Sequence, residues 1–97
     1  MNELNRENFE INAKIMKAFS DPCRLKIIKL LKDKSLNATE LLEYLHISQP
    51  TLSHHMKILK DSGVVKIKKD GKWSFYTLSE DMLIEVSDYL RRIVRCK

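Results

Sequence analysis

The sequence predicts a mainly α-helical domain that carries one small β-hairpin. Apolar residues recur at helical spacing over most of the 97 residues, and the pattern changes to alternation only after Gly63. The alternating runs, VVKIKK and KWSFYTL, flank Asp70-Gly71, a dipeptide typical of two-residue hairpin turns. We therefore expect several helices, a hairpin over residues 64–78 and a final helix over about 80–96.

The composition indicates a single small domain whose net charge favours a polyanionic partner, although its surface is mixed rather than a basic tail. The chain has 18 Lys and Arg residues against 13 Asp and Glu, a net charge of +5. It contains neither a signal-peptide core nor an apolar run long enough to cross a membrane, and its two cysteines form no C-x-x-C motif. We expect one cytoplasmic domain over residues 1–97 without a membrane partner. A core this small would gain from oligomerisation.

The first and last helices, expected over about 8–19 and 80–96, are more apolar than one small domain can cover. The first carries apolar residues on two opposite sides, Ile11, Ile15, Ala18 and Phe19 on one and Phe9, Ala13 and Met16 on the other. The last helix begins after Ser79 and has a broad stripe of Met82, Leu83, Val86, Tyr89, Leu90 and Ile93. We expect these two helices to form a homodimer interface.

Two further helices are predicted between them. Asp21 is an N-cap followed by Pro22 at the first helical position, and this helix is expected to bury Leu25, Ile28 and Leu31, with Ile27 and Leu30 at the flanks. A brief extended segment at Ser35-Leu36 follows. Asn37 and Glu40 then have capping-box spacing and begin a short helix with the stripe Ala38, Leu41, Leu42 and Leu45.

A helix over residues 48–62 follows after a tight turn, which makes a helix-turn-helix. Ser48 is its N-cap, Pro50 lies in its first turn and Gly63 can adopt the left-handed conformation that ends it. We expect His46 in the turn to have a positive φ, because histidine tolerates it better than the β-branched Ile47. A metal-ligand role for His46 is not favoured, since no second ligand lies at a useful spacing.

The two faces of the 48–62 helix differ in chemistry. Leu52, Met56 and Leu59 form an apolar stripe, whereas Gln49, Ser53, His54 and Lys57 point away from it. Short polar side chains of this kind can read base edges or hold phosphates in the major groove. An ordinary solvated helix surface is the alternative.

The hairpin is expected to pack on the helices through Val65, Ile67, Tyr76 and Leu78, with Lys66, Lys68, Trp73 and Phe75 on its other face. Lys68, Lys69 and Lys72 cluster at its tip. A basic hairpin directly after a helix-turn-helix can lie along phosphates as a wing. The same lysines can also protect an exposed strand edge from aggregation, and the two roles are compatible.

This order of elements resembles the winged-helix repressors of the ArsR/SmtB family. AFSDPCRLKIIKLL is similar to the family's opening phrase, SQPTLSHHMKILKDSGVV to its recognition helix and KDGKWSFYTL to its wing. The resemblance implies a homodimeric repressor that binds operator DNA and is released by an inducer. Matched position by position, the DNA-contacting residues would be Gln49, Ser53 and His54, supported by Thr51 and Lys57, with Lys68, Lys69 and Lys72 in the wing. His55 is expected to be structural.

The sensing chemistry departs from the family's pattern. Where related sensors have a C-x-C pair this chain has Asn37 and Thr39, and where zinc sensors have Asp and His pairs it has Glu80, Met82, Ile93 and Cys96. We therefore expect no bound metal and no cofactor, and the inducer is unknown.

Cys23 and Cys96 resemble the cysteine pair of family members that sense persulfides or oxidants. Cys23, near a helix N-terminus and beside Arg24, could have a lowered thiol pKa. Both cysteines could instead be small packed hydrophobes.

The leading hypothesis is a sequence-specific DNA-binding repressor. A winged helix used as a protein-interaction or generic nucleic-acid-binding module is the alternative. An enzyme is not expected, because the sequence provides no group that would orient a base beside a nucleophile.

Overall fold

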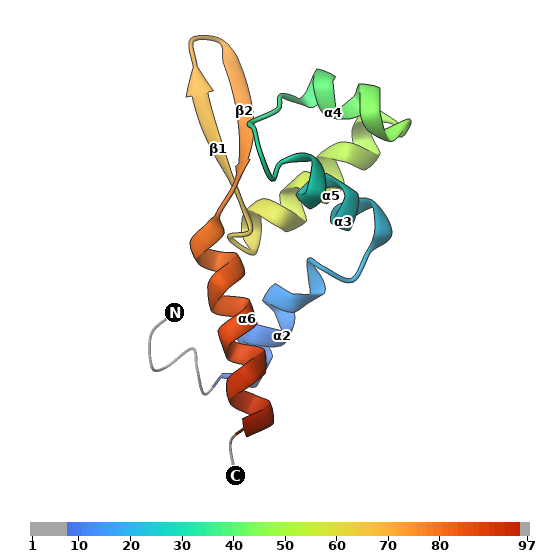
Figure 1. The fold of residues 1–97 in the computed structure, drawn as a ribbon. Coiled ribbons are helices and arrows are strands. Elements are labelled where there is room, and N and C mark those ends of the chain that lie inside the picture. The colour runs from blue at the N-terminus through green and yellow to red at the C-terminus, as the bar shows by residue number, and fades with distance from the viewer. Residues whose placement is uncertain (1–7, 96–97) are drawn as a thin grey trace.

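The computed structural model describes residues 8–95, which form five helices and one two-stranded antiparallel sheet (Figure 1). In chain order the elements are α2 (Phe9–Lys17), α3 (Pro22–Leu30), α4 (Ala38–Leu45), α5 (Gln49–Asp61), β1 (Val65–Asp70), β2 (Trp73–Leu78) and α6 (Glu80–Arg95). The mainly α-helical fold with a hairpin wing that the sequence predicts is confirmed.

The core lies where α3, α4 and α5 pack on one another and on the base of the hairpin. Leu36, in the expected extended segment, pairs with Tyr76 of β2 through backbone hydrogen bonds of 3.1 and 2.8 Å. This bridge ties the segment before α4 to the wing. The fully buried side chains at the centre include Ile27, Leu36, Leu41, Leu52, Leu59, Val64 and Val65.

Helix α3 corrects one prediction about the core. Leu25, expected to be buried, is 51% exposed, whereas Ile27 is 0% exposed. The inward face of α3 instead starts at Arg24, whose buried guanidinium bonds to neighbouring elements, and continues through Ile27 and Leu31. Arg24, Ile27 and Leu31 are three and four residues apart and therefore lie on one face of the helix. Leu25 is not part of this series and lies on the outer side.

The hairpin turn is one residue later than predicted. Asp70 pairs with Trp73, so Gly71 and Lys72 are the central turn residues, and Gly71 has φ 61°. A glycine with positive φ at the first central position is the pattern of a type II′ turn. The face assignment is unchanged, because Val65 pairs with Leu78 and Ile67 with Tyr76. Ile67 is nevertheless 38% exposed. The tip of the hairpin projects beyond the helices (Figure 1).

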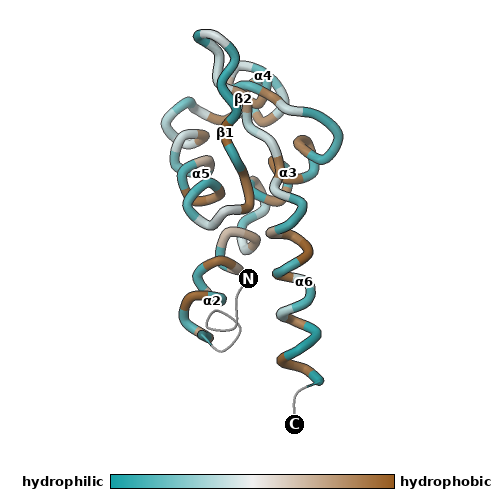
Figure 2. The backbone as a smooth tube through the Cα atoms, turned by 90° about the vertical axis from the view of Figure 1, so that its left-hand side faces the viewer, coloured by the Kyte–Doolittle hydropathy of each residue, from teal (hydrophilic) through white to brown (hydrophobic). Residues whose placement is uncertain are grey.

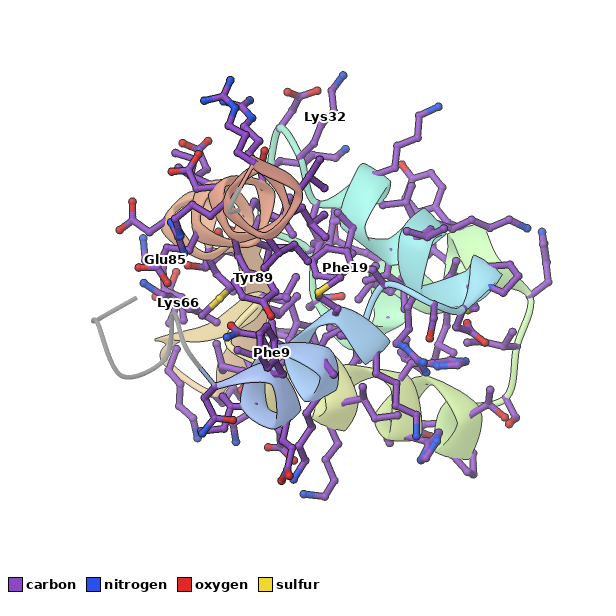
Figure 3. The ribbon with its side chains drawn as sticks, turned by 90° about the horizontal axis from the view of Figure 1, so that it is seen from below. Phe9, Phe19, Lys32, Lys66, Glu85 and Tyr89 are labelled. Carbon is purple, nitrogen blue, oxygen red and sulfur yellow. The ribbon has the colours of Figure 1, made fainter. Side chains whose placement is uncertain are left out.

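Helices α2 and α6 extend away from this core, and their free ends lie at the opposite end of the molecule from the hairpin tip (Figure 2). Figure 3 shows Tyr89, which is buried, pointing from α6 toward α2. Other large apolar residues of the two helices are exposed: Phe9, Ile11, Ile84, Leu90, Ile93 and Val94. Among the described residues, no helix combines the length and the apolar character that crossing a bilayer requires.

Candidate nucleic-acid interface

The caps at the turn between α4 and α5 determine where α4 ends and where α5 begins. Helix α4 begins with a capping box, in which the Asn37 side chain accepts from the Glu40 backbone N–H at 2.8 Å and the Glu40 carboxylate accepts from the Asn37 N–H at 2.9 Å. His46 ends α4 with φ 53°, the left-handed conformation predicted for it. Ser48 then caps α5 by accepting from the Thr51 N–H at 3.2 Å. Three residues, 46–48, therefore connect the two helices.

The C-terminal end of α5 is determined by Gly63. Gly63 has φ 84°, and the Val64 N–H donates to the Leu59 carbonyl at 3.1 Å, so the helix ends in a left-handed cap as predicted. A Cβ on Gly63 would lie 2.9 Å from the Met82 side chain of α6. The positive φ is the reason that glycine is favoured here, because the Met82 methyl group lies at the end of a flexible side chain and could shift.

Helix α5 separates its two faces as its sequence pattern indicates. Leu52, Met56 and Leu59 are buried. The side chains proposed to meet DNA are all exposed, namely Gln49, Thr51, Ser53, His54 and Lys57. Lys57 forms an exposed ion pair with Asp61 at 3.0 Å, and such a pair contributes little to stability. Lys57 can therefore leave Asp61 for a phosphate at little cost.

His55 faces the interior, where it meets Arg24. Arg24 Nη1 lies 3.1 Å from His55 Nδ1, and Nε and Nη2 donate to the carbonyls of Ala18 at 3.0 Å and Lys17 at 3.3 Å. Arginine only donates, so Nδ1 accepts and a neutral His55 carries its proton on Nε2. That nitrogen lies 3.9 Å from a carboxylate oxygen of Asp21. One buried guanidinium thus connects the end of α2, the start of α3 and the middle of α5.

The structural role expected for His55 agrees with this placement, but the partner role of Arg24 was not predicted. An arginine between Cys23 and Leu25 carries no sequence signal of burial. The useful signal for His55 was its place beside the apolar stripe of Leu52, Met56 and Leu59, which are buried.

Asp21 has a pKa below the usual value of an aspartate. The main cause is the hydrogen bond that its carboxylate accepts from the Arg24 backbone N–H, at 3.0 Å, and electrostatic attraction to His55 and Arg24 acts in the same direction. Desolvation opposes them. Asp21 therefore stays ionised at neutral pH and caps α3 as an anion.

Cys23 does not have the lowered pKa that its position suggested. Burial raises the pKa of the Cys23 thiol, the Asp21 carboxylate raises it further, and Lys26 and Arg24 lower it less. Cys23 is half-buried against the core. A raised pKa disfavours the reactive thiolate at neutral pH. Cys96, the other cysteine of the candidate pair, lies outside the described residues.

Potential metal-ligand atoms of Asp21, Cys23 and His55 lie within 4.8 Å of one another. The sequence did not suggest this cluster, because its members come from two helices. Coordination through His55 Nε2 would require the proton to move to Nδ1 and the bond from Arg24 to break. The hydrogen bonding around His55 therefore opposes a metal at this position.

The wing brings three more cations to the same end of the molecule as α4. Lys68, Lys69 and Lys72 are exposed, and the strand register places them at or next to the hairpin turn. Lys68 pairs with Phe75 and Lys69 with Ser74, so the two lysines lie on opposite faces of the hairpin. Trp73, next to the turn, is 53% exposed. The tip thus presents positive charge on both faces of the hairpin.

Comparisons with known proteins agree on one family. Residues 21–66 match the family of bacterial regulatory proteins described as the arsR family. An uncharacterized HTH-type transcriptional regulator of Methanocaldococcus jannaschii is 44% identical over 81 residues, which cover 82% of this chain and 91% of that protein. The arsenical resistance operon repressor of Staphylococcus xylosus is 45% identical over 78 residues, 80% of this chain and 71% of the repressor.

Solved structures are also similar to this chain over most of its length. An ArsR-like transcriptional regulator from Rhodococcus sp. RHA1 is similar with a TM-score of 0.81 and 26% identity, over 88% of this chain and 80% of the other. HlyU from Vibrio cholerae is similar with a TM-score of 0.70 and 28% identity, over the full length of both chains.

Proposed function

Because this chain belongs to the ArsR family of bacterial regulatory proteins, we propose that it is a homodimeric repressor that binds a specific operator and is released by an inducer. The family consists of DNA-binding transcriptional regulators and not of enzymes. The alternative of a protein-interaction or generic nucleic-acid-binding module is not favoured. The protein would act in the cytoplasm, where operator DNA is found.

The outward face of α5 is the observation that carries this proposal. The side chains of Gln49, Ser53 and His54 are exposed and form no hydrogen bond within residues 8–95, while the opposite face of α5 is anchored in the core. Such groups can form bonds to base edges without first breaking bonds within the protein. An apolar outward face would have favoured a protein partner instead.

Phosphate contacts would come from Thr51 and Lys57 of α5 and from the three wing lysines. They would position α5 on the duplex and provide a sequence-independent share of the affinity. Such contacts release counterions, so the affinity should fall steeply as salt rises.

A homodimer through α2 and α6 would cover the apolar residues that these helices expose. Phe9 is 67%, Ile84 59% and Val94 83% exposed, and together with Leu90 and Ile93 they would leave a large apolar surface in water. Two copies would also place two recognition helices about one helical turn of DNA apart, roughly 34 to 36 Å. We therefore propose an operator with two related half-sites.

Operator binding by the purified protein tests the proposal. The chain should prefer DNA from upstream of its own gene to random DNA of the same length at moderate salt. The logarithm of the affinity should fall linearly with the logarithm of the salt concentration. Equal affinity for the two DNAs at every salt concentration would contradict sequence-specific repression.

A further inference from the structure

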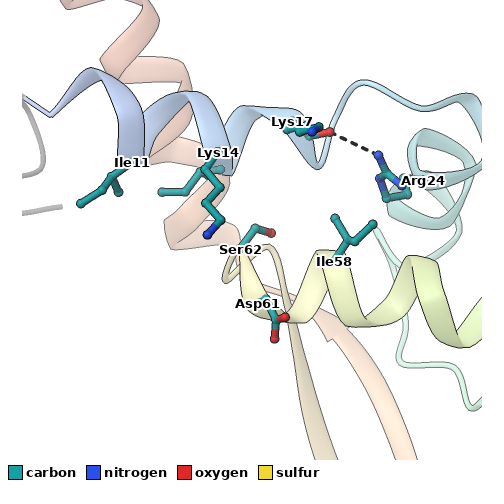
Figure 4. Close-up of a pocket in the computed structure, with 8 residues that line it drawn as sticks. Ile11, Lys14, Lys17, Arg24, Ile58, Asp61 and Ser62 are labelled. Carbon is teal, nitrogen blue, oxygen red and sulfur yellow. Dashed lines mark hydrogen bonds between the residues drawn. The ribbon is translucent and has the colours of Figure 1, made fainter.

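A groove of about 510 Å³ lies between α2 and the C-terminal half of α5 (Figure 4). Its apolar lining comes from Ile11 and Ile15 of α2 and from Ile58 of α5. The volume is within the range of about 300 to 1,000 Å³ that is typical of sites for small organic ligands. None of the residues proposed to contact DNA lines this groove, which we call the α2–α5 groove.

The α2–α5 groove is positively charged. Lys14 extends from α2 toward the α5 side (Figure 4), and Lys17 and Arg24 also line it. Asp61 is the acidic residue among the lining residues, and it is already paired with Lys57 at 3.0 Å. The excess of cations over this paired acid favours an anionic occupant.

Arg24 provides a preformed anion-binding group in the groove. It is only 8% exposed, and three of its five N–H groups donate to Ala18, Lys17 and His55. The other two N–H groups have no acceptor within residues 8–95. A buried guanidinium with unused N–H groups matches a carboxylate better than it matches a neutral ligand.

We propose that the α2–α5 groove binds a small organic anion, a carboxylate with an aliphatic body, and that occupancy changes the position of α5 relative to α2. The aliphatic body would lie among the three isoleucines, and the carboxylate would accept from Lys14 and Arg24. The effect on DNA rests on the proposed repressor function, whereas the binding itself does not.

The connection to α5 follows from the contacts that Arg24 already makes. Its guanidinium holds the carbonyls of Lys17 and Ala18 at the end of α2 and His55 in the middle of α5. A carboxylate on Arg24 would therefore bind where these elements meet. A ligand can shift a conformational equilibrium only through such differential contacts.

Octanoate is a suitable probe, with octan-1-ol as the neutral control of equal chain length. Isothermal titration calorimetry of the full chain, without DNA, should show saturable octanoate binding and much weaker octanol binding. Lys14→Gln should weaken octanoate binding about three- to tenfold, because it removes one charged donor. Lys26→Gln, which changes an exposed α3 lysine outside the groove, should leave it unchanged.

A second variant tests the place of binding. Ile11 is 43% exposed at the edge of the groove, so Ile11→Trp should narrow the groove without disturbing the core, and it should reduce octanoate binding. Circular dichroism checks that the variant is folded, and light scattering checks that it keeps the wild-type mass, because Ile11 is also among the α2 residues that the proposed dimer would cover. Equal binding of octanoate and octanol, no effect of Lys14→Gln and Ile11→Trp, or no saturable binding would overturn the proposed site.

Operator binding with and without octanoate then tests the regulatory part separately. A change in operator affinity in the wild type that is reduced in Lys14→Gln supports coupling. Octanoate binding with unchanged operator affinity would overturn the coupling and leave the ligand site. Loss of all sequence preference in DNA binding would refute the repressor function, while the calorimetry would still decide whether the groove binds anions.

Discussion

His54 and His55 are neighbours in the chain but lie in opposite environments. His54 is exposed on the outer face of α5, whereas His55 is 9% exposed and bonded to Arg24. Two identical side chains at consecutive positions thus lie one at the surface and one in the interior. This contrast allows each to act as the control for the other.

His54→Ala should reduce sequence discrimination without unfolding the protein. A side chain that reads a base edge contributes about 1 to 3 kcal/mol of discrimination, so the preference for operator over random DNA should fall accordingly. Competition binding with both DNAs measures it, and thermal denaturation should match the wild type. An equal loss of affinity for both DNAs would indicate a phosphate contact instead.

His55→Ala should have the opposite effect, destabilising the fold. It removes the acceptor of a buried guanidinium N–H and opens a cavity, which together cost roughly 2 to 4 kcal/mol. Chemical denaturation measures the loss, with His54→Ala as the matched control. Wild-type stability in His55→Ala would show that the Arg24–His55 bond contributes nothing.

The pKa of Asp21 predicts a specific acid response. Because this pKa is lower in the folded protein than in the unfolded chain, the ionised carboxylate stabilises the fold above the unfolded value of about 3.8. That contribution should disappear as the pH falls below 3.8 and through the lower folded pKa. Asp21→Asn keeps a capping side chain but removes the charge, so it should be less stable at pH 7 and less sensitive to acid in this range. Denaturation at pH values from 2 to 7 measures both effects.

The wing and α5 are proposed to make different kinds of contact with DNA. The wing lysines lie at the end of a hairpin whose base is fixed by Val65 and by the Leu36–Tyr76 bridge. Their register places charge on both hairpin faces. We infer that the wing adds affinity, whereas α5 adds specificity.

Replacing Lys68, Lys69 and Lys72 together by glutamine should weaken binding to operator and random DNA alike. Each phosphate contact that is lost should reduce the slope of log affinity against log salt by about 0.9. A salt series of binding isotherms measures it. Lys29→Gln, on the exposed surface of α3, provides the control. A changed preference between DNA sequences would instead assign base reading to the wing.

The elements that local sequence determines were predictable. The Ser48 cap, the positive φ of His46 and the stripe of Leu52, Met56 and Leu59 depend on residues within one or two turns. The hairpin turn was misplaced by one residue, because Asp-Gly and Gly-Lys can both occupy a two-residue loop and only strand pairing decides between them.

The errors elsewhere come from contacts that are distant in sequence. Arg24 and His55 are separated by 31 positions, so neither residue's own neighbours reveal their bond. That bond turns Arg24 inward and exposes Leu25. The raised pKa of Cys23 depends mainly on its burial, which the whole fold determines, and then on Asp21; together they outweigh Lys26 and Arg24.

The whole molecule consists of a compact helix-turn-helix core with its wing, and a pair of helices, α2 and α6, that extend from it. The core supports α5 for DNA binding, whereas the exposed apolar residues of α2 and α6 suit a second copy. Changes in how α2 meets the core would then alter the spacing of two recognition helices. The proposed dimer is therefore needed for both specificity and regulation.

Leu90→Glu should convert the proposed dimer into a monomer. Leu90 is 40% exposed on α6, so a glutamate is tolerated in the single chain, but a charge buried against a second copy has no partner and is strongly unfavourable. Size-exclusion chromatography with light scattering should show half the wild-type mass. Operator affinity should fall by orders of magnitude, because a monomer holds only one half-site. Leu25→Glu, at a residue that is 51% exposed on α3, is the matched control and should remain dimeric. An unchanged mass for Leu90→Glu would mean that α6 does not form the dimer interface.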